Sequence, residues 1–224
     1  MGEKLIILFD LDGTLIDSTE AILESFHYAF DFYGYSHPND EDIKALIGHP
    51  LDVMFARLGV EEERVWDFVT VYKEHYREIS TQKTVLLPYA KEAVELAASF
   101  AELGIVTTKT GKYSRVLMEY FGLMNKFKVL IGREHVEHPK PHAEPILKAL
   151  EVFDIEEKSD VWIIGDTELD MMAAEAAGIK GIGVLSGYDS KETLKKFTNV
   201  IFSDAYEAVK WLKSRKLSHN SLTI

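Results

Sequence analysis

Short apolar runs alternate with longer stretches of helical periodicity over most of the chain. Residues 5–9 are continuously apolar and lead through acidic residues to a turn at Gly13, which is typical of a buried parallel strand. Similar runs predict five further strands, the last of them weak, at residues 104–106, 129–131, 161–164, 182–185 and 200–202. Helical spacing predicts helices at about 88–102, 113–121, 143–150 and 168–177. This alternation predicts an α/β fold, a doubly wound parallel sheet with helices on both faces.

The alternation is interrupted once, directly after the first strand. Residues 18–83 contain no convincing strand, and their apolar residues recur at helical spacing. We therefore expect a helical domain inserted into an α/β core. The predicted division is a core at residues 1–17 and 84–212, a helical domain at 18–83, and a polar, loosely held tail at 213–224.

Composition narrows the possible partners. The chain is 46% hydrophobic and carries a net charge of −12, which argues against a nucleic acid or an anionic membrane as its main partner. It has no cysteine, so disulfides and cysteine-ligated metals are excluded. Its apolar runs are too short for a signal peptide or a membrane span. We expect a cytoplasmic protein, either a monomer or a homodimer.

Two acids stand two residues apart at the end of the first predicted strand. Asp10 and Asp12 precede a tight turn at Gly13 and Thr14. Carboxylates this close repel each other unless a cation lies between them or their tasks differ. Beside Mg²⁺, one carboxylate can attack phosphorus while the other acts as acid and base. An isolated Asp-x-Asp is more often an acidic turn, but the strand before it and the Gly-Thr after it favour chemistry.

Three more polar segments follow in fixed order. Asp166 and Asp170 come after the apolar run at 161–164, where a strand tip and the next helical turn let both face one metal. Thr107 closes another strand, and Lys140 lies between two prolines. Each alone has an ordinary structural explanation, as a helix cap, a turn or a surface lysine. Together, at the carboxyl edge of a parallel sheet, they predict a Mg²⁺-dependent phosphate site.

The four segments resemble, in order, the four motifs of the haloacid dehalogenase-like hydrolase superfamily. Residues 9–18 are close to the first motif at almost every position, and the resemblance extends to about residue 212. It is nearest to the phosphoglycolate phosphatase-like branch, which also contains pyrophosphatases and β-phosphoglucomutases. The resemblance implies a Rossmann-like core, with the helical insert in the position of the family's C1 cap.

The resemblance also implies roles for individual residues. Asp10 would be the nucleophile and a metal ligand, and Asp12 the acid/base, with a backbone carbonyl that also binds Mg²⁺. Thr107 would bind the transferring phosphoryl group, which Lys140 would steady together with Asp10. An acid at Asp12 argues for phosphate ester or anhydride chemistry, because dehalogenases and phosphonatases of the family lack one there.

The remaining assignments concern the metal and the substrate. Asp166 would be a metal ligand with Asp170 close by, and Thr108 would contact substrate in a place where this branch usually has Asn. The loop around His49 resembles one that dips toward the site in relatives. Other basic residues of the insert that could meet an anionic leaving group are Lys44, Arg57, Arg64, Lys73, His75 and Arg77. For most of these, a solvated helix face is the commoner role.

The expected function is Mg²⁺-dependent hydrolysis of a small phosphorylated metabolite through an aspartyl-phosphate. Phosphoglycolate is the family-level favourite, and pyrophosphatase or β-phosphoglucomutase-like activities are alternatives. A phosphorylatable signalling module of the receiver type uses similar acids but has no helical insert after its first strand. A non-catalytic metal-binding protein is the third alternative, which retention of all four motifs disfavours.

Overall fold

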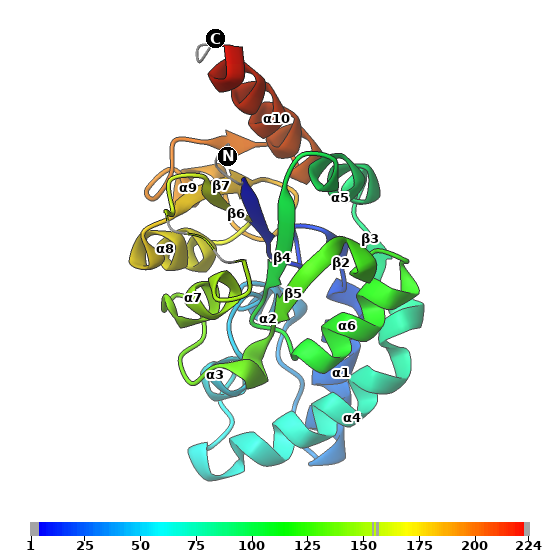
Figure 1. Cartoon of the computed structure of the whole chain (residues 1–224). Helices are drawn as coiled ribbons and strands as arrows, with labels where there is room; N and C mark the ends of the chain where they lie inside the picture. The colour runs from blue at the N-terminus through cyan, green and yellow to red at the C-terminus, as the bar shows by residue number, and fades with distance from the viewer. Residues whose placement is uncertain (1–4, 154, 156, 222–224) are drawn as a thin grey trace.

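The computed structural model describes residues 5–153, 155 and 157–221. Within them, six strands form one sheet in the order β5-β4-β1-β6-β7-β8, and all neighbouring strands are parallel (Figure 1). The strands are β1 (Ile6–Phe9), β4 (Glu102–Val106), β5 (Phe127–Ile131), β6 (Val161–Gly165), β7 (Lys180–Val184) and β8 (Ile201–Phe202). The order reverses at β1, as a doubly wound sheet requires, so the predicted fold class is confirmed.

Alternate side chains of β1 serve the two faces of the sheet. Ile7 and Phe9 pack against one layer of helices, whereas Ile6 and Leu8 pack against the other. The first layer contains α5 (Ala90–Ala98), α6 (Gly111–Tyr120) and α10 (Ala205–Ser221). The second contains α7 (Glu144–Leu150) and α8 (Glu168–Ala177). Short helices complete the core: η2 (Met124–Lys126), η3 (Arg133–His135) and α9 (Lys191–Leu194).

The segment after the first strand folds into a helical unit, residues 18–83, with a hydrophobic cluster of its own. Its helices are α1 (Thr19–Phe32), α2 (Asp40–Lys44), α3 (Leu51–Arg57), η1 (Glu62–Arg64) and α4 (Val65–Lys83). Phe26 of α1 and Phe55 of α3 pack with ring centroids 4.5 Å apart, and Phe68 of α4 joins them. The buried aromatic residues of α1, Phe26 and Phe30, therefore belong to this core. The unit lies beyond the carboxyl ends of the sheet strands (Figure 1).

A small ribbon connects the two parts of the molecule. Strands β2 (Ile16–Asp17) and β3 (Val85–Leu86) pair antiparallel, one just before and one just after the helical unit. Strands of two residues are too short to show a period of two, so the sequence pattern does not predict them. The ribbon brings both chain crossings to one place beside the carboxyl end of β1.

The structure differs from the expectation at two helix boundaries. The helix expected to reach residue 102 ends at Ala98, because Glu102 already pairs with Ile6 in the sheet. The expected tail is helical as far as Ser221, where α10 ends. Lys216 of this segment donates to the carbonyl of Phe100, and Arg215 lies over the Trp211 ring. Its polar sequence thus belongs to a partly exposed helix; residues 222–224 lie outside the described part.

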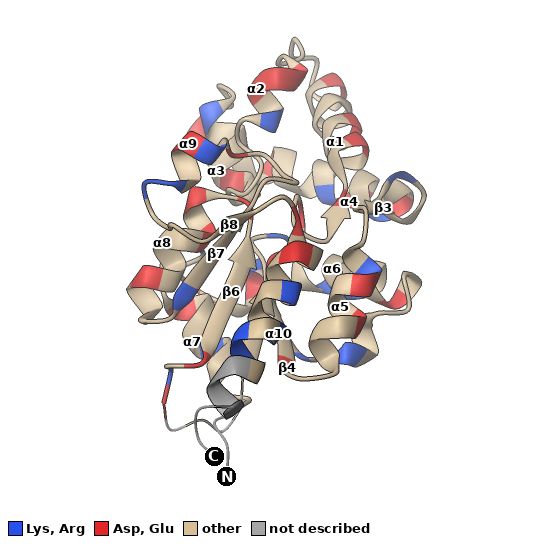
Figure 2. Ribbon diagram, turned by 90° about the horizontal axis from the view of Figure 1, so that it is seen from above, with Lys and Arg blue, Asp and Glu red and all other residues tan. Residues whose placement is uncertain are grey.

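Charged residues of both signs are distributed over the outer helices, with acidic groups prominent on α1 and α2 (Figure 2). Among the described residues, no helix combines the length and the apolar character that crossing a membrane requires.

Candidate active site

Three carboxylates meet at the carboxyl edge of the sheet. Asp10 follows β1, Asp166 follows β6, and Asp170 lies in the first turn of α8. All three are buried, and one carboxylate oxygen of each lies within 4.8 Å of the others. Parallel strands end at the same edge, so the two apolar runs that precede the acids bring these side chains together.

The turn after β1 is shaped to lie against Asp166. Gly13 adopts φ +80°, and a Cβ on it would lie 2.3 Å from an Asp166 carboxylate oxygen, so a larger residue does not fit. Thr14 donates its hydroxyl to Asp166 Oδ1 at 3.0 Å. On the other side, the backbone N–H of Tyr188 donates to Asp166 Oδ2, also at 3.0 Å. Asp166 is therefore fixed from two segments.

Asp170 is fixed by the start of α8. Thr167 is the N-cap, and both its backbone N–H and its hydroxyl donate to Asp170 Oδ2, at 3.1 and 2.8 Å. This capping interaction accounts for one oxygen of the carboxylate. The other oxygen, Oδ1, is directed to Lys140.

Lys140 supplies the positive charge of the cluster. Its ammonium lies 2.9 Å from Asp10 Oδ1 and 2.5 Å from Asp170 Oδ1, and it donates to the carbonyl of Val106 at 3.1 Å. Burial opposes a charged lysine, but the carboxylates of Asp10 and Asp170 outweigh it and raise the pKa of Lys140. In this position between two prolines, the Lys140 side chain points toward the carboxylates of Asp10 and Asp170.

One lysine does not balance three carboxylates. Burial raises the pKa of Asp10 to about 6; Lys140 counteracts this rise, and Asp170 adds to it. Burial, together with the charges of Asp10 and Asp170, raises the pKa of Asp166 as well. Burial and mutual repulsion therefore disfavour three ionised carboxylates here, and a bound divalent cation would stabilise their charged forms.

The side chain of Asp12 lies apart from this cluster. Lys109 places its ammonium 3.0 Å from Asp12 Oδ2 and 3.2 Å from Oδ1, and Ser18 donates a short hydrogen bond to Oδ1. The Lys109 ammonium also lies 4.6 Å from the centroid of the Tyr76 ring, in the helical unit. Asp12 and Asp10 thus have different partners, as different tasks would require.

The two threonines after β4 also differ in their surroundings. Thr107 is buried at the strand end, and its hydroxyl accepts a bond from the backbone N–H of Lys109 at 3.2 Å. Thr108 instead donates its hydroxyl to the carbonyl of Gly48 in the helical unit, at 2.8 Å. Next to Gly48, His49 accepts a hydrogen bond from Arg57 at 3.0 Å. Burial and the Arg57 guanidinium both lower the pKa of His49.

A cavity of about 240 Å³ opens between the sheet edge and the helical unit. Asp12, Thr108 and Lys109 line the side formed by the core, and His49 and Lys73 contribute polar groups from the helical unit. Most of the remaining lining is apolar or aromatic, including Ile22, Ile47, Met54, Val69, Tyr72 and Tyr76. Several other basic residues of the unit are engaged elsewhere: Lys44 with Glu41, Arg64 with Asp67 and His75 with Glu24.

The sequence did not identify several contacts of the site, among them those of Lys109 and of the Tyr188 backbone. Lys109 follows directly after the two threonines at a strand end, and this position is the feature that could have indicated it. The backbone of Tyr188 lies far along the chain from Asp166, and a backbone donor leaves no trace in residue type. Both contacts arise because separate βα loops converge at one edge of the sheet.

Fold and site together define a Rossmann-like α/β protein with a buried carboxylate–lysine centre beneath a helical unit. The family model "Haloacid dehalogenase-like hydrolase" matches residues 7–184. The chain belongs to this family, so the predicted membership and the prediction of a hydrolytic enzyme are confirmed.

Individual relatives match almost end to end. "Probable phosphatase IndB" of Dickeya dadantii is 31% identical, with 92% of each chain covered. "Pyrophosphatase PpaX" of Bacillus velezensis is also 31% identical, over 87% of this chain and 94% of the relative. Among solved structures, the haloacid dehalogenase-like hydrolase SP0104 of Streptococcus pneumoniae superposes with TM-score 0.83 at 27% identity, covering 94% of this chain and 99% of its own. A "predicted phosphoglycolate phosphatase" from Haemophilus somnus gives TM-score 0.84 at 26% identity, covering 94% and 98%.

Proposed function

We propose that this hydrolase is a Mg²⁺-dependent phosphatase that cleaves small phosphate monoesters through an aspartyl-phosphate on Asp10. The observation that carries the proposal is the cluster of Asp10, Asp166 and Asp170 around Lys140, with Asp12 held apart beside Lys109. The phosphatase names of several relatives support the same reaction class.

The donor set suits Mg²⁺. The cluster offers only carboxylate oxygens as ligands, and it is buried. Its three carboxylates outnumber its one positively charged side chain, Lys140. Hard oxygen donors of this kind are the ligands that Mg²⁺ prefers. Asp10, Asp166 and the backbone carbonyl of Asp12 would hold the ion, with Asp170 close by. When bound, Mg²⁺ neutralises charge on the phosphoryl oxygens.

The protein's own residues then divide the reaction. A carboxylate oxygen of Asp10 attacks phosphorus and forms the acyl phosphate as the bond to the leaving oxygen breaks. Asp12 gives that oxygen a proton, and afterwards takes one from the water that hydrolyses the aspartyl-phosphate. The Thr107 hydroxyl and the Lys140 ammonium stabilise the charge of the transferring group.

We further propose that the helical unit, residues 18–83, acts as the cap that selects the substrate over a core at 1–17 and 84–212. The cavity supports this role, because it begins at Asp12, the group assigned to the leaving oxygen. Its apolar lining from the helical unit favours an ester whose alcohol carries an apolar or aromatic part. A pyrophosphatase is the second candidate, favoured by the names of PpaX relatives. Pyrophosphate has no apolar part, so it would make no contact that requires the apolar wall of the cavity.

The test compares phosphate release by the wild type, Asp10→Asn and Asp67→Asn, an exposed acid of α4 that serves as the matched control. Each protein receives aromatic and aliphatic phosphate esters, phosphoglycolate and pyrophosphate, with Mg²⁺ or with EDTA. We expect Mg²⁺-dependent release that falls at least about 1,000-fold in Asp10→Asn and persists in the control. Turnover at the wild-type rate by a folded Asp10→Asn variant would refute the role of Asp10 as the nucleophile. A preference for pyrophosphate over every ester would favour the second candidate.

A further inference from the structure

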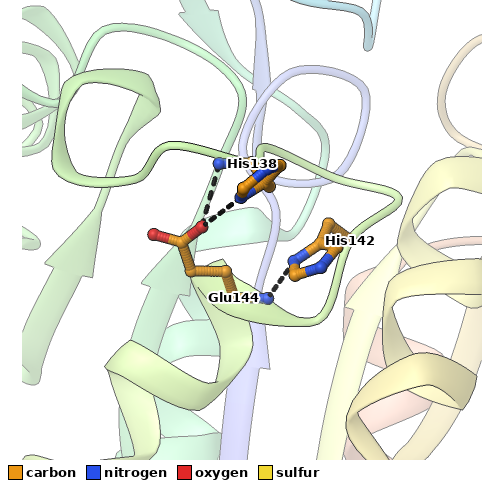
Figure 3. Close-up of side chains that lie close together, drawn as sticks. All are labelled: His138, His142 and Glu144. Atoms are coloured by element: carbon orange, nitrogen blue, oxygen red, sulfur yellow. Dashed lines mark hydrogen bonds and ion pairs between the residues drawn. The ribbon is translucent and has the colours of Figure 1, made fainter.

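The loop that carries Lys140 has a second group of polar side chains on its outer side. In the sequence, His138 precedes Lys140, and His142 and Glu144 follow it. Figure 3 shows that the side chains of His138, His142 and Glu144 lie close together. Lys140 points inward and is buried, whereas both histidines are exposed. These three residues are therefore not part of the buried carboxylate–lysine centre of the candidate active site.

Glu144 is oriented by the loop backbone. Its Oε1 accepts the N–H of Glu137 at 3.0 Å, and its Oε2 accepts the N–H of His138 at 2.9 Å. These bonds hold the carboxylate at the start of α7 and explain its position without any ligand. Both imidazoles contact the same residue: His138 Nδ1 forms a hydrogen bond with Glu144 Oε2, and His142 Nδ1 accepts the backbone N–H of Glu144 (Figure 3).

The histidine nitrogens lie at distances that suit a metal ion. His138 Nδ1 is 3.2 Å from Glu144 Oε2, close to the roughly 3.3 Å that separates two ligand atoms of a tetrahedral Zn²⁺. His142 Nδ1 accepts the backbone N–H of Glu144, and its Nε2 forms no hydrogen bond within the part of the chain that the structure describes. The two rings lie 4.8 Å apart at a 36° angle, and one ligand atom from each of the three residues lies within 4.8 Å of the others. This spacing is wider than that around one Zn²⁺ ion, so the exposed rings would have to turn to bring all three ligand atoms to the ion.

We propose that His138, His142 and Glu144 form a second cation site, which takes Zn²⁺ or another divalent ion that prefers imidazole nitrogen. Two imidazoles and one carboxylate, with water in an open position, match this class of ion and not Mg²⁺. The site would link residues on both sides of Lys140. Lys148 lies 3.2 Å from Glu144 Oε1, the oxygen turned away from His138, and its charge should weaken binding without blocking it.

The test is calorimetric titration of the full chain with Zn²⁺ in excess Mg²⁺, which competes for the buried carboxylates. The variants are His138→Ala and His142→Ala, because both residues are exposed and neither imidazole takes part in the bonds that the Glu144 carboxylate accepts from the N–H groups of Glu137 and His138. The matched control is His37→Ala, which removes one ring of another surface pair, His27 and His37, whose centroids lie 4.7 Å apart.

We expect the wild type and His37→Ala to bind one equivalent of Zn²⁺, with affinity at least about tenfold weaker in either of the other variants. Lys148→Met should bind more tightly than the wild type. The same isotherm in all proteins would place bound Zn²⁺ elsewhere and overturn the proposal. Absence of binding to the wild type would overturn it equally.

Discussion

The two walls of the candidate active site differ in how they are built. At the sheet edge, buried carboxylates and Lys140 are fixed by short bonds to one another and to the backbone. The facing wall, from the helical unit, is mostly apolar, and basic residues such as Lys44 and His75 pair with acids of the same unit. Under the proposed function, the sheet edge would carry out one reaction, and residues of the helical unit could change to accept another substrate without altering the groups that react.

The largest effect on stability should come from removing the positive charge of Lys140 at the sheet edge. Lys140→Met would leave the carboxylates of Asp10 and Asp170 buried without their partner, which should lower the free energy of unfolding by about 3 kcal/mol. The raised pKa of Lys140 keeps the lysine charged up to pH 10.5 and beyond, and its partner Asp10, with a pKa of about 6, is largely ionised at neutral pH. The loss should therefore be seen at neutral pH.

Urea unfolding of Lys140→Met and of the exposed control Lys112→Met, in EDTA and in Mg²⁺, checks this expectation. Mg²⁺ should stabilise the Lys140 variant more than the wild type, because it replaces the missing charge. A variant as stable as the wild type in EDTA would mean that the carboxylates do not need the lysine.

A smaller effect should follow at the junction of the walls, where Lys109 contacts both Asp12 and the Tyr76 ring. Lys109→Met should lower kcat about 10- to 100-fold with little change in KM, because Asp12 loses the group that positions it. Lys109→Arg should restore part of the rate, and the pH profile of kcat should shift in Lys109→Met. Lys112→Met, an exposed lysine of α6, is the control. An unchanged pH profile would reduce Lys109 to a structural role.

The difference between the two walls also explains which parts of the site could be predicted from the sequence. Acids at the tips of buried strands could be located because apolar runs and strand order bring them to one edge, so Asp10 and Asp166 were found together. Lys109 and the backbone of Tyr188 were missed, because their roles depend on where loops meet in space. In the helical unit, periodicity predicted helices and a core, but which side chains face the cavity depends on how the unit sits over the sheet. Lys73 faces it and Lys44 does not, although both looked alike in sequence.

The smallest effect separates two roles for Thr108, whose hydroxyl joins the sheet edge to Gly48 of the helical unit. The sequence predicts a substrate contact, whereas the structure gives the hydroxyl a partner in the helical unit. Thr108→Val keeps the shape and removes the hydrogen bond, which should cost about 0.5–1.5 kcal/mol of stability and speed amide exchange in the loop at residues 47–49. If the hydroxyl only joins the walls, KM should change less than twofold for every ester tested, while exchange in the loop increases. A larger rise in KM with amide exchange unchanged would mean that the Thr108 hydroxyl binds the substrate. In that case the sheet-edge wall would contribute to substrate binding as well as to the reaction.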